Sequence, residues 1–558
     1  MENDWTGLDK YYKDPSLKDI YETLLSKDLS DCVMHARSVL SKTNNWMKFL
    51  FNEKSTLISG YYLKHGSLMS ERDPEQALLK YNTALLLAPF DSETMKLAYR
   101  ARADISLCFL QCNSCINNIN TCLALNCSQD LVDELMEMKS KAEQLVYIEK
   151  QASDILSSSF TDNFFNIKGN NVEVPCATPD VDVKVESGRV KVVAARDVAV
   201  GTLLAKETAF ITATHSKNKF ISCHYCLRIS PDLKPCDGCC KALFCDENCK
   251  EKSMLEGHDV ECKIIDIIVD DVKLPFKALL KIRRLCNSWD EFIAVSNILG
   301  TDEMNNEFTE RIFGSNKFSV LKSRSDKRFI HGKMFNSCMC IVNIIHYLEL
   351  RTSFLPECAE EREAVIRAVA RIFLYLSLYC TPVRMLHAIS LGEMQLHDYT
   401  NRGYFPLIGN LEHSCTPNTF VIGLRNSVAL LALQPIKKGE QLTFSYTGHY
   451  LTTVPGRERV MELLISYGIV CKDCVVCEDN IPHHQPLDLK QLIAVLGRPT
   501  SDDFHVNTKD VYENVCRIMN LLNSVSFSRE YFDIFVTFVK YIMFFAMVNY
   551  PNVYIQST

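Results

Sequence analysis

The feature that most constrains this chain is a run of eight possible metal ligands between residues 223 and 262. The run reads CHYC, PCDGC, FCDENC and HDVEC, and its candidate ligands are Cys223, Cys226, Cys236, Cys239, Cys245, Cys249, His258 and Cys262. Thiolates two or three residues apart can face one small tetrahedral ion, and an imidazole can replace one sulfur. Eight ligands fill two four-ligand sites with no open position, which predicts two structural zinc ions.

We expect an interleaved arrangement, in which Cys223, Cys226, Cys245 and Cys249 bind one ion and the other four ligands bind the second. Cys240 is a spare cysteine. The alternatives are buried free cysteines or a disulfide framework. Disulfides need an oxidising compartment, and the opening residues MENDWTGLDKYYKD show no secretory pattern. Twenty-five cysteines in this context favour reduced thiols and metal, and hence the cytoplasm and nucleus.

Length and charge narrow the classes of function. With 558 residues, 47% apolar and 23% charged, the chain is expected to form several globular domains. Its net charge is −7, and residues 216–263 hold eight basic and eight acidic residues, so direct nucleic-acid binding is not expected. The apolar run at 532–550 is interrupted by Asp533 and Lys540. It predicts a buried core helix rather than a membrane span.

Helical patterns fill the first 150 residues. Ala77, Tyr81, Ala84 and Leu85 share one helix face, Pro89 ends that helix, and similar segments follow to Val146. This series resembles tetratricopeptide repeats, with ordinary amphipathic helices as the alternative. A loop-like stretch follows, and then strands are expected at 190–195 and 203–209. Helices are expected again at 275–285, 291–298 and 361–379.

A second motif lies near residue 410. It consists of Gly403-Tyr-Phe-Pro406, Leu411-Glu-His-Ser-Cys-Thr-Pro-Asn418 and Gly439-Glu-Gln-Leu-Thr-Phe-Ser-Tyr446. By itself HSCxPN is a polar turn, and Tyr446 could be an ordinary core tyrosine. Cys471, Cys474 and Cys477 follow, and three cysteines need a fourth metal ligand, for which Cys415 is the candidate.

Together the two motifs resemble the SET- and MYND-domain family of lysine methyltransferases, in the branch with N-terminal tetratricopeptide repeats. The resemblance implies an α+β fold with a β-rich SET domain that is split by the finger and flanked by helical regions. The expected order is an N-terminal helical segment (1–65), repeats (66–150), a linker (151–182), the first SET part (183–222) and the MYND finger (223–262). A helical insertion (263–380), the SET core (381–450), a post-SET zinc segment (451–480) and a helical C-terminal region (481–558) follow.

The resemblance also implies chemistry. The cofactor would be S-adenosylmethionine, with Tyr446 as the catalytic tyrosine, and the reactive substrate group would be a lysine of a protein. Cofactor contacts would come from Gly188, Arg189, Glu412, His413 and Tyr446. One zinc ion would join Cys415 to Cys471, Cys474 and Cys477, and Asn418 would close the loop. Family members bind histone deacetylases and proline-rich segments, so both are expected partners.

The chain departs from the family pattern in four places, and the first three favour an alternative, a scaffold that binds cofactor weakly or not at all. Glu412 replaces an asparagine, and an ionised carboxylate can only accept hydrogen bonds. Ser187-Gly188-Arg189 lacks one glycine of the cofactor loop, and Ile389-Ser-Leu-Gly392 lacks an expected asparagine. The last cysteines are spaced CxxCxxC instead of CxCxxC. The sequence thus leaves an enzyme and a scaffold as competing interpretations.

Overall fold

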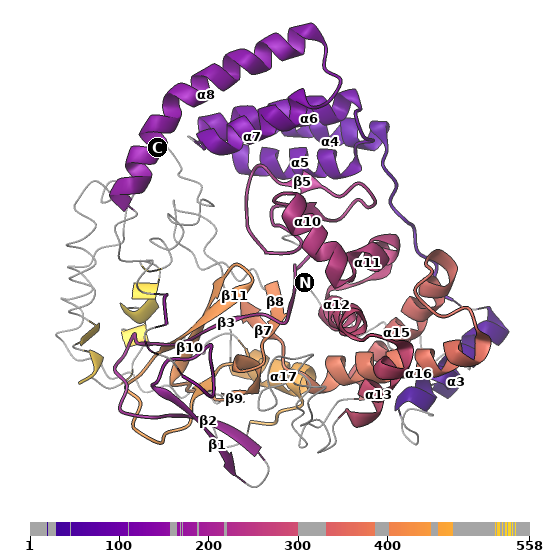
Figure 1. The fold of residues 1–558 in the computed structure, drawn as a ribbon, viewed down its shortest axis with the longest axis vertical. Coiled ribbons are helices and arrows are strands. Elements are labelled where there is room, and N and C mark those ends of the chain that lie inside the picture. Colours follow the sequence, from indigo (N-terminus) through magenta and orange to yellow (C-terminus); the bar gives the residue numbers. More distant parts are fainter. Residues whose placement is uncertain are drawn as a thin grey trace.

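The structure is a computed structural model of the full chain. It describes residues 29–156, 171–299, 331–385, 401–447 and 456–471 apart from short gaps, with small pieces at 19–20, 165–169 and 519–542. Figure 1 shows an array of helices at one end and a mixed region of strands at the other. The cysteine-rich segment lies between them, and a second group of helices lies beside the strands.

The N-terminal array consists of antiparallel helices that pack in chain order. They are α4 (Thr56–Met69), α5 (Pro74–Leu87), α6 (Glu93–Cys108), α7 (Cys112–Leu123) and α8 (Gln129–Leu156). Ser55, Asp73 and Ser92 each accept a backbone N–H at the start of a helix. The four residues placed on one face of α5 are all buried. α4 includes residue 65, and α8 continues six residues past residue 150.

Strands before and after the cysteine-rich segment pair with one another. β3 (Leu203–Thr208) pairs with β11 (Ser427–Ala432), which pairs with β10 (Thr419–Leu424). β4 (Ile211–Ala213) pairs with β8 (Asn401–Tyr404), which pairs with β7 (Val383–Met385). β1 (Val181–Glu186) and β2 (Arg189–Ala194) form a hairpin. Two distant stretches of the chain therefore build one β-rich region, as expected for a split domain.

The residues between these two stretches are mostly helical. After the hairpin of β5 (Lys234–Pro235) and β6 (Leu243–Phe244) come α10 (Glu247–Ser253), a π-helical turn (Met254–His258) and α11 (Asp259–Ile264). The expected helices of the insertion are present and begin earlier than expected: α12 (Asp270–Leu285), α13 (Trp289–Ile298) and α16 (Ala359–Tyr379). With α15 (His331–Arg351) and α3 (Leu29–Thr43) they enclose one apolar core.

The chain beyond residue 447 is described only in part. α17 (Gly456–Tyr467) packs its buried Leu463 and Tyr467 into the core of the β-rich region. The pieces near residue 535 place Phe532 and Phe535 against Phe420 of β10. Most of the apolar run at 532–550 lies outside the described residues. Among the helices that are described, none is long and apolar enough to cross a membrane.

Candidate metal centres and cofactor site

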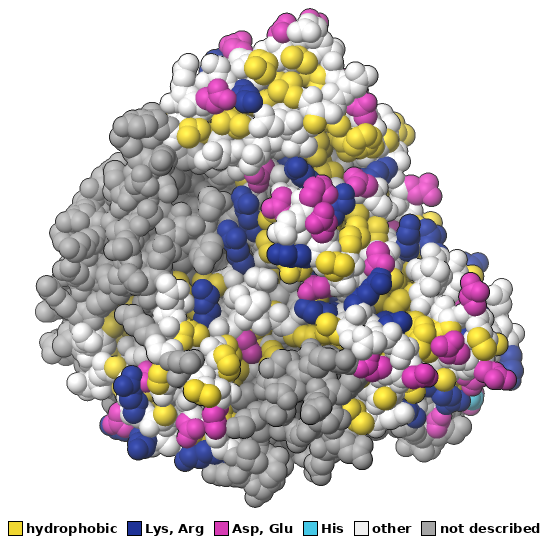
Figure 2. All heavy atoms as spheres, in the orientation of Figure 1, with side chains coloured by type: hydrophobic (Ala, Val, Ile, Leu, Met, Phe, Trp, Pro, Cys, Tyr) yellow, Lys and Arg dark blue, Asp and Glu magenta, His cyan; other side chains and the backbone are white. Residues whose placement is uncertain are grey.

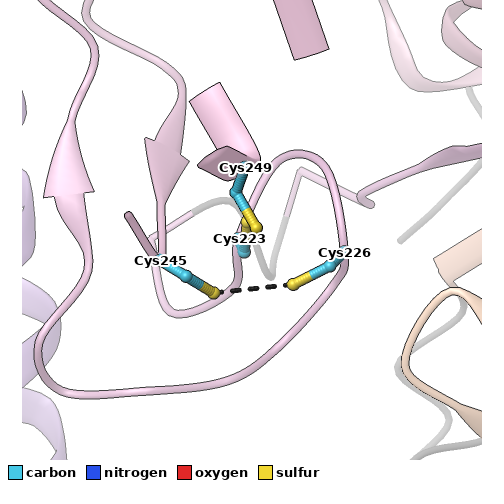
Figure 3. Close-up of side chains that lie close together, drawn as sticks. All are labelled: Cys223, Cys226, Cys245 and Cys249. Atoms are coloured by element: carbon cyan, nitrogen blue, oxygen red, sulfur yellow. Dashed lines mark hydrogen bonds between the residues drawn. The ribbon is translucent and has the colours of Figure 1, made fainter. Parts of the chain in front are cut away.

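The structure brings the eight ligands of the cysteine-rich segment together as two groups of four. In each group the ligand atoms lie within 4.8 Å of one another. Figure 3 shows the side chains of the first group turned toward one another. The groups have the interleaved membership that the spacing predicts: Cys223, Cys226, Cys245 and Cys249 in one, and Cys236, Cys239, His258 and Cys262 in the other.

The separations within these groups fit tetrahedral zinc. The Sγ atoms of Cys226 and Cys245 are 3.5 Å apart, and those of Cys236 and Cys262 are 3.8 Å apart. Zn–S bonds at tetrahedral angles place two sulfurs about 3.8 Å apart, whereas a disulfide bond is about 2.05 Å long. Four sulfurs in one group, and three sulfurs with one imidazole in the other, are donor sets of structural zinc sites. The geometry therefore favours metal ions over a disulfide framework.

Local structure explains how the ligands converge. Asp246 caps α10 by accepting the N–H of Cys249 at 2.8 Å, which fixes that cysteine in the first turn. Gly257 has a φ of 118°, and a Cβ there would lie 2.5 Å from Leu280 Cβ. Gly238 is equally constrained, because a Cβ there would lie 2.8 Å from Cys262 Sγ. The absence of a side chain at these two glycines lets the backbone pass close to Leu280 and Cys262, and this close approach is needed to assemble the second ligand group.

A buried carboxylate supports the second group from outside. Glu261 Oε2 lies 2.8 Å from His258 Nδ1 and 2.8 Å from His224 Nε2, and Glu261 and both histidines are fully buried. The pairing leaves Nε2 of His258 to face Cys239 Sγ, 3.9 Å away. Burial would raise the pKa of Glu261, but the neighbouring His224, His258 and Lys277 bring it well below its ordinary value. Such outer carboxylates orient metal-binding histidines.

The third proposed metal site is only partly visible. Cys415 Sγ lies 3.6 Å from Cys471 Sγ, again the separation of two sulfurs on one tetrahedral ion. Cys474 and Cys477 lie outside the described residues. Cys240, the spare cysteine, is directed to the backbone oxygen of Asn52 at 3.6 Å. The structure thus brings together two of the four ligands that the sequence assigns to this site.

Tyr446 is buried where three polar contacts meet. Its hydroxyl donates to the Leu411 carbonyl at 2.6 Å, its N–H donates to His413 Nδ1 at 3.1 Å, and its carbonyl accepts the hydroxyl of Tyr467 at 2.9 Å. The side chain is 2% exposed. The tyrosine is therefore held firmly against the motif that contains His413.

The two halves of the second motif are joined by a short parallel ladder. β12 (Thr443–Phe444) pairs with β9 (Glu412–His413) in parallel. Asn418 locks this crossing, because its side-chain oxygen accepts the N–H of Thr443 at 2.9 Å and its amide donates to the Gln441 carbonyl at 2.8 Å. The polar turn that contains His413 and Asn418 is thus held beside β12, the strand that ends two residues before Tyr446.

Both ring nitrogens of His413 are engaged within the protein. Because Nδ1 accepts the N–H of Tyr446, the proton is assigned to Nε2, which lies 3.3 Å from Cys415 Sγ. Any contact of His413 with a cofactor would therefore come from its backbone or its ring face. Glu412 is half-buried beside it. Arg189 opens β2, and Gly188 and residues 389–392 lie outside the described residues.

The sequence interpretation missed three residues of this region. Tyr467 contacts Tyr446, Glu261 supports the second ligand group, and Glu207 bonds to the loop before Leu411. Glu261 follows His258 at helical spacing, which was the available signal. Glu207 offered no such signal, because Lys206 and Thr208 flank it in the polar half of β3.

The sequence is similar to a SET-domain model and to known lysine methyltransferases. A model of the SET domain matches residues 188–447. The chain is 22% identical over 361 residues to protein-lysine N-methyltransferase SMYD4 of Pongo abelii, covering 51% of this chain and 44% of the relative. It is also 22% identical over 326 residues to N-lysine methyltransferase SMYD2-B of Xenopus laevis, covering 58% of this chain and 66% of the relative.

The alignment with human protein-lysine N-methyltransferase SMYD4, 23% identical over 359 residues, likewise covers 51% of this chain and 44% of the relative. The chain thus spans less than half the length of these two SMYD4 proteins. The matched SET region includes β2 to β4 and β7 to β12, together with the residues between them, and begins just after β1. The chain therefore contains a SET domain and is related, at low identity, to the SMYD protein-lysine methyltransferases.

Proposed function

We propose that this chain is an S-adenosylmethionine-dependent protein-lysine N-methyltransferase of the SET and MYND type, acting on a nuclear or cytosolic protein. The observation that carries the proposal is the buried Tyr446, held by Leu411 and His413 within a SET domain. We also propose that the N-terminal array consists of tetratricopeptide repeats. The run of antiparallel helices α4 to α8 supports this assignment.

The chemistry asks the protein mainly for positioning. When bound, S-adenosylmethionine supplies a methyl group on a sulfonium, which a neutral amine can attack in line. The described residues serve this by excluding water and fixing orientation, because Tyr446 and Tyr467 are both buried and hydrogen-bonded to each other. A dry site disfavours the charged form of an entering lysine amine, which promotes its nucleophilic form.

The residues proposed to hold the cofactor are Gly188, Arg189, Glu412 and the backbone of His413. Glu412 fits one part of that ligand, because a carboxylate can accept hydrogen bonds from an ammonium. The test is calorimetric titration of zinc-replete protein with S-adenosylmethionine, wild type beside Glu412→Asn. Micromolar binding by the wild type supports the enzyme, and methyl transfer to a lysine-containing protein would then be measured with Tyr446→Phe as the inactive control.

The second candidate function is a scaffold that keeps the SET architecture without catalysis. Glu412 favours it, because a carboxylate cannot supply the hydrogen-bond donor of the family's asparagine. If the wild type does not bind S-adenosylmethionine and Glu412→Asn does, this single side chain explains the loss. The protein would then act through its partners alone.

The proposed function also includes structural zinc ions, protein partners and a cellular location. We propose two zinc ions in the cysteine-rich segment and one shared by Cys415, Cys471, Cys474 and Cys477. Histone deacetylases and proline-rich segments are the proposed partners, in the cytoplasm and nucleus. On the face drawn in Figure 2 positive and negative side chains are interspersed, which supports protein partners over nucleic acid. Binding to a proline-rich peptide array should be lost in Cys236→Ala and kept in Cys240→Ala, and equal binding by both would refute this role.

A further inference from the structure

Glu207 is a buried acid that joins the two stretches of the SET domain. It lies in β3, next to the sheet partner β11, and its residue is 5% exposed. One carboxylate oxygen accepts the N–H of Leu407 at 2.7 Å, and the other accepts the N–H of Ile408 at 2.9 Å. Both oxygens are therefore directed to the backbone of a single turn, 200 residues further along the chain.

The environment of this carboxylate makes its charge costly. Burial raises the pKa of Glu207 to about 7, although the N–H groups of Leu407 and Ile408 act in the opposite direction. The titratable neighbour on the strand side is Cys176, whose own pKa is raised to about 12 by burial and then by Glu207. In the pairing with β11, Glu207 faces the apolar Val428. The turn itself contributes backbone amides.

The turn held by Glu207 leads directly to the candidate active site. A 3₁₀ turn (Ile408–Asn410) begins at the second of the two amides, and Leu411 comes next. The carbonyl of Leu411 accepts the hydroxyl of Tyr446 at 2.6 Å, and Glu412 and His413 follow. The position of the Leu411 carbonyl therefore depends on where the preceding turn is fixed.

We propose that Glu207 is a positioning residue for the methyl-transfer site, acting through the turn at Leu407 and Ile408 on the Leu411 carbonyl and Tyr446. The inference rests on the proposed function, since it assigns a role within the same site. The ionised carboxylate is the competent form, because it can accept from both amides at once. A protonated carboxyl or a glutamine amide keeps only one good acceptor.

The experiment compares wild type, Glu207→Gln and Asp197→Asn. Asp197 is a matched control, because it also joins the two stretches, accepting the N–H of Lys438 at 2.9 Å, but it lies on the surface. Hydrogen–deuterium exchange of peptides covering residues 405–413 is measured first, without cofactor. S-adenosylmethionine affinity is then measured by calorimetry at pH 6 and pH 8.

Glu207→Gln should speed exchange of the Leu407 and Ile408 amides, with slow exchange kept elsewhere in β3 and β11. Its affinity for S-adenosylmethionine should be near that of wild type at pH 6 and about tenfold weaker at pH 8, as expected for one lost charge-assisted hydrogen bond. Titration of the cofactor itself changes both affinities equally, so it cancels when the affinity of the variant is divided by that of the wild type at the same pH. Asp197→Asn should match the wild type in both measurements.

A general loss of stability would lower affinity equally at both pH values, and that result would overturn the positioning role. Unchanged exchange at residues 405–413 in Glu207→Gln would overturn it as well. If wild type does not bind S-adenosylmethionine, the proposed function fails, and the exchange measurement still decides whether Glu207 fixes the turn.

Discussion

Replacing Arg102 should weaken the attachment of the N-terminal array to the cysteine-rich segment. Arg102 lies on α6 and is fully buried. Its guanidinium donates to Asn82 Oδ1 at 2.9 Å, to Asn118 Oδ1 at 3.0 Å and to the Leu233 carbonyl at 2.7 Å. The two asparagines in turn donate to carbonyls of Phe220 and Pro231. One cation therefore organises the contact between the two parts.

The size of the effect follows from these contacts. Hydrogen bonds to a charged group contribute roughly 1.5–3 kcal/mol each. Removing the guanidinium leaves the buried oxygens of Asn82, Asn118 and Leu233 without this donor, and each buried acceptor left without a partner costs about 1–3 kcal/mol. We expect Arg102→Met, which keeps an unbranched apolar stem and none of the donors, to destabilise this contact by about 4 kcal/mol.

Native-state hydrogen exchange is the appropriate assay, because unfolding of a chain with several domains is not a two-state process. Amides of α5, α6 and the β5–β6 hairpin that exchange through opening of this contact should exchange several hundredfold faster in Arg102→Met. Arg100→Met is the matched control on the same helix, since Arg100 is partly exposed and pairs with Glu134 at the surface. Such surface pairs contribute about 0–1 kcal/mol. If Arg102→Met changes exchange no more than this control, the reasoning is wrong.

Three further predictions concern metal and pH. Mass spectrometry under native conditions should show Cys236→Ala losing one zinc ion and Cys240→Ala none, because only Cys236 lies in a ligand group. Glu261→Gln should weaken zinc binding about tenfold to a hundredfold in a chelator competition, whereas Glu256→Gln, which removes a surface-side pair with Lys281, should not. The pKa of Glu207 is raised in the fold to about 7, so its contribution to stability is complete below pH 4.5 and is lost as pH rises through 7. Native-state hydrogen exchange of the β3 and β11 amides across this range should show a fall of about 3 kcal/mol in the free energy of opening, which Glu207→Gln should remove; an unchanged pH profile in that variant would contradict the assignment.

The sequence predicts best where the chemistry is local. The two ligand groups follow from spacing, because four ligands of one ion must lie close together wherever the rest of the chain runs. Helices such as α16 follow from a long apolar periodicity that ends at Cys380-Thr381-Pro382. Their start residues are less certain from sequence, because the first turn of a helix carries polar residues that resemble a loop.

The burial of individual charged residues could not be predicted from the sequence. Glu207 and Arg102 each look like ordinary surface residues within a strand and a helix. Their partners are backbone groups and asparagine side chains, most of them far away in sequence, and these types of partner occur throughout any chain. Nothing in their spacing distinguishes a buried hydrogen-bonded charge from a solvated one.

The lysines of α12 are further charged residues whose contacts the sequence does not reveal, and they connect the cysteine-rich segment to the SET domain. Lys273, Lys277 and Lys281 recur every four residues, a pattern that predicts a solvated helix face. In the structure they donate to the carbonyls of Thr214, His224 and Phe210 at 3.0, 3.2 and 2.5 Å.

Those carbonyls belong to the segment that runs from β3 through β4 into the cysteine-rich segment, where helix-type or sheet-type pairing cannot satisfy all of them. Lysine suits this task, because its long apolar stem can pack against the core while its ammonium reaches a backbone oxygen. The helix that reads as surface thus fastens the connection between the SET strands and the ligand groups. Movement of the cysteine-rich segment relative to the candidate active site would have to break either the Lys277 contact with His224 or the contacts of Lys273 and Lys281 beside β4.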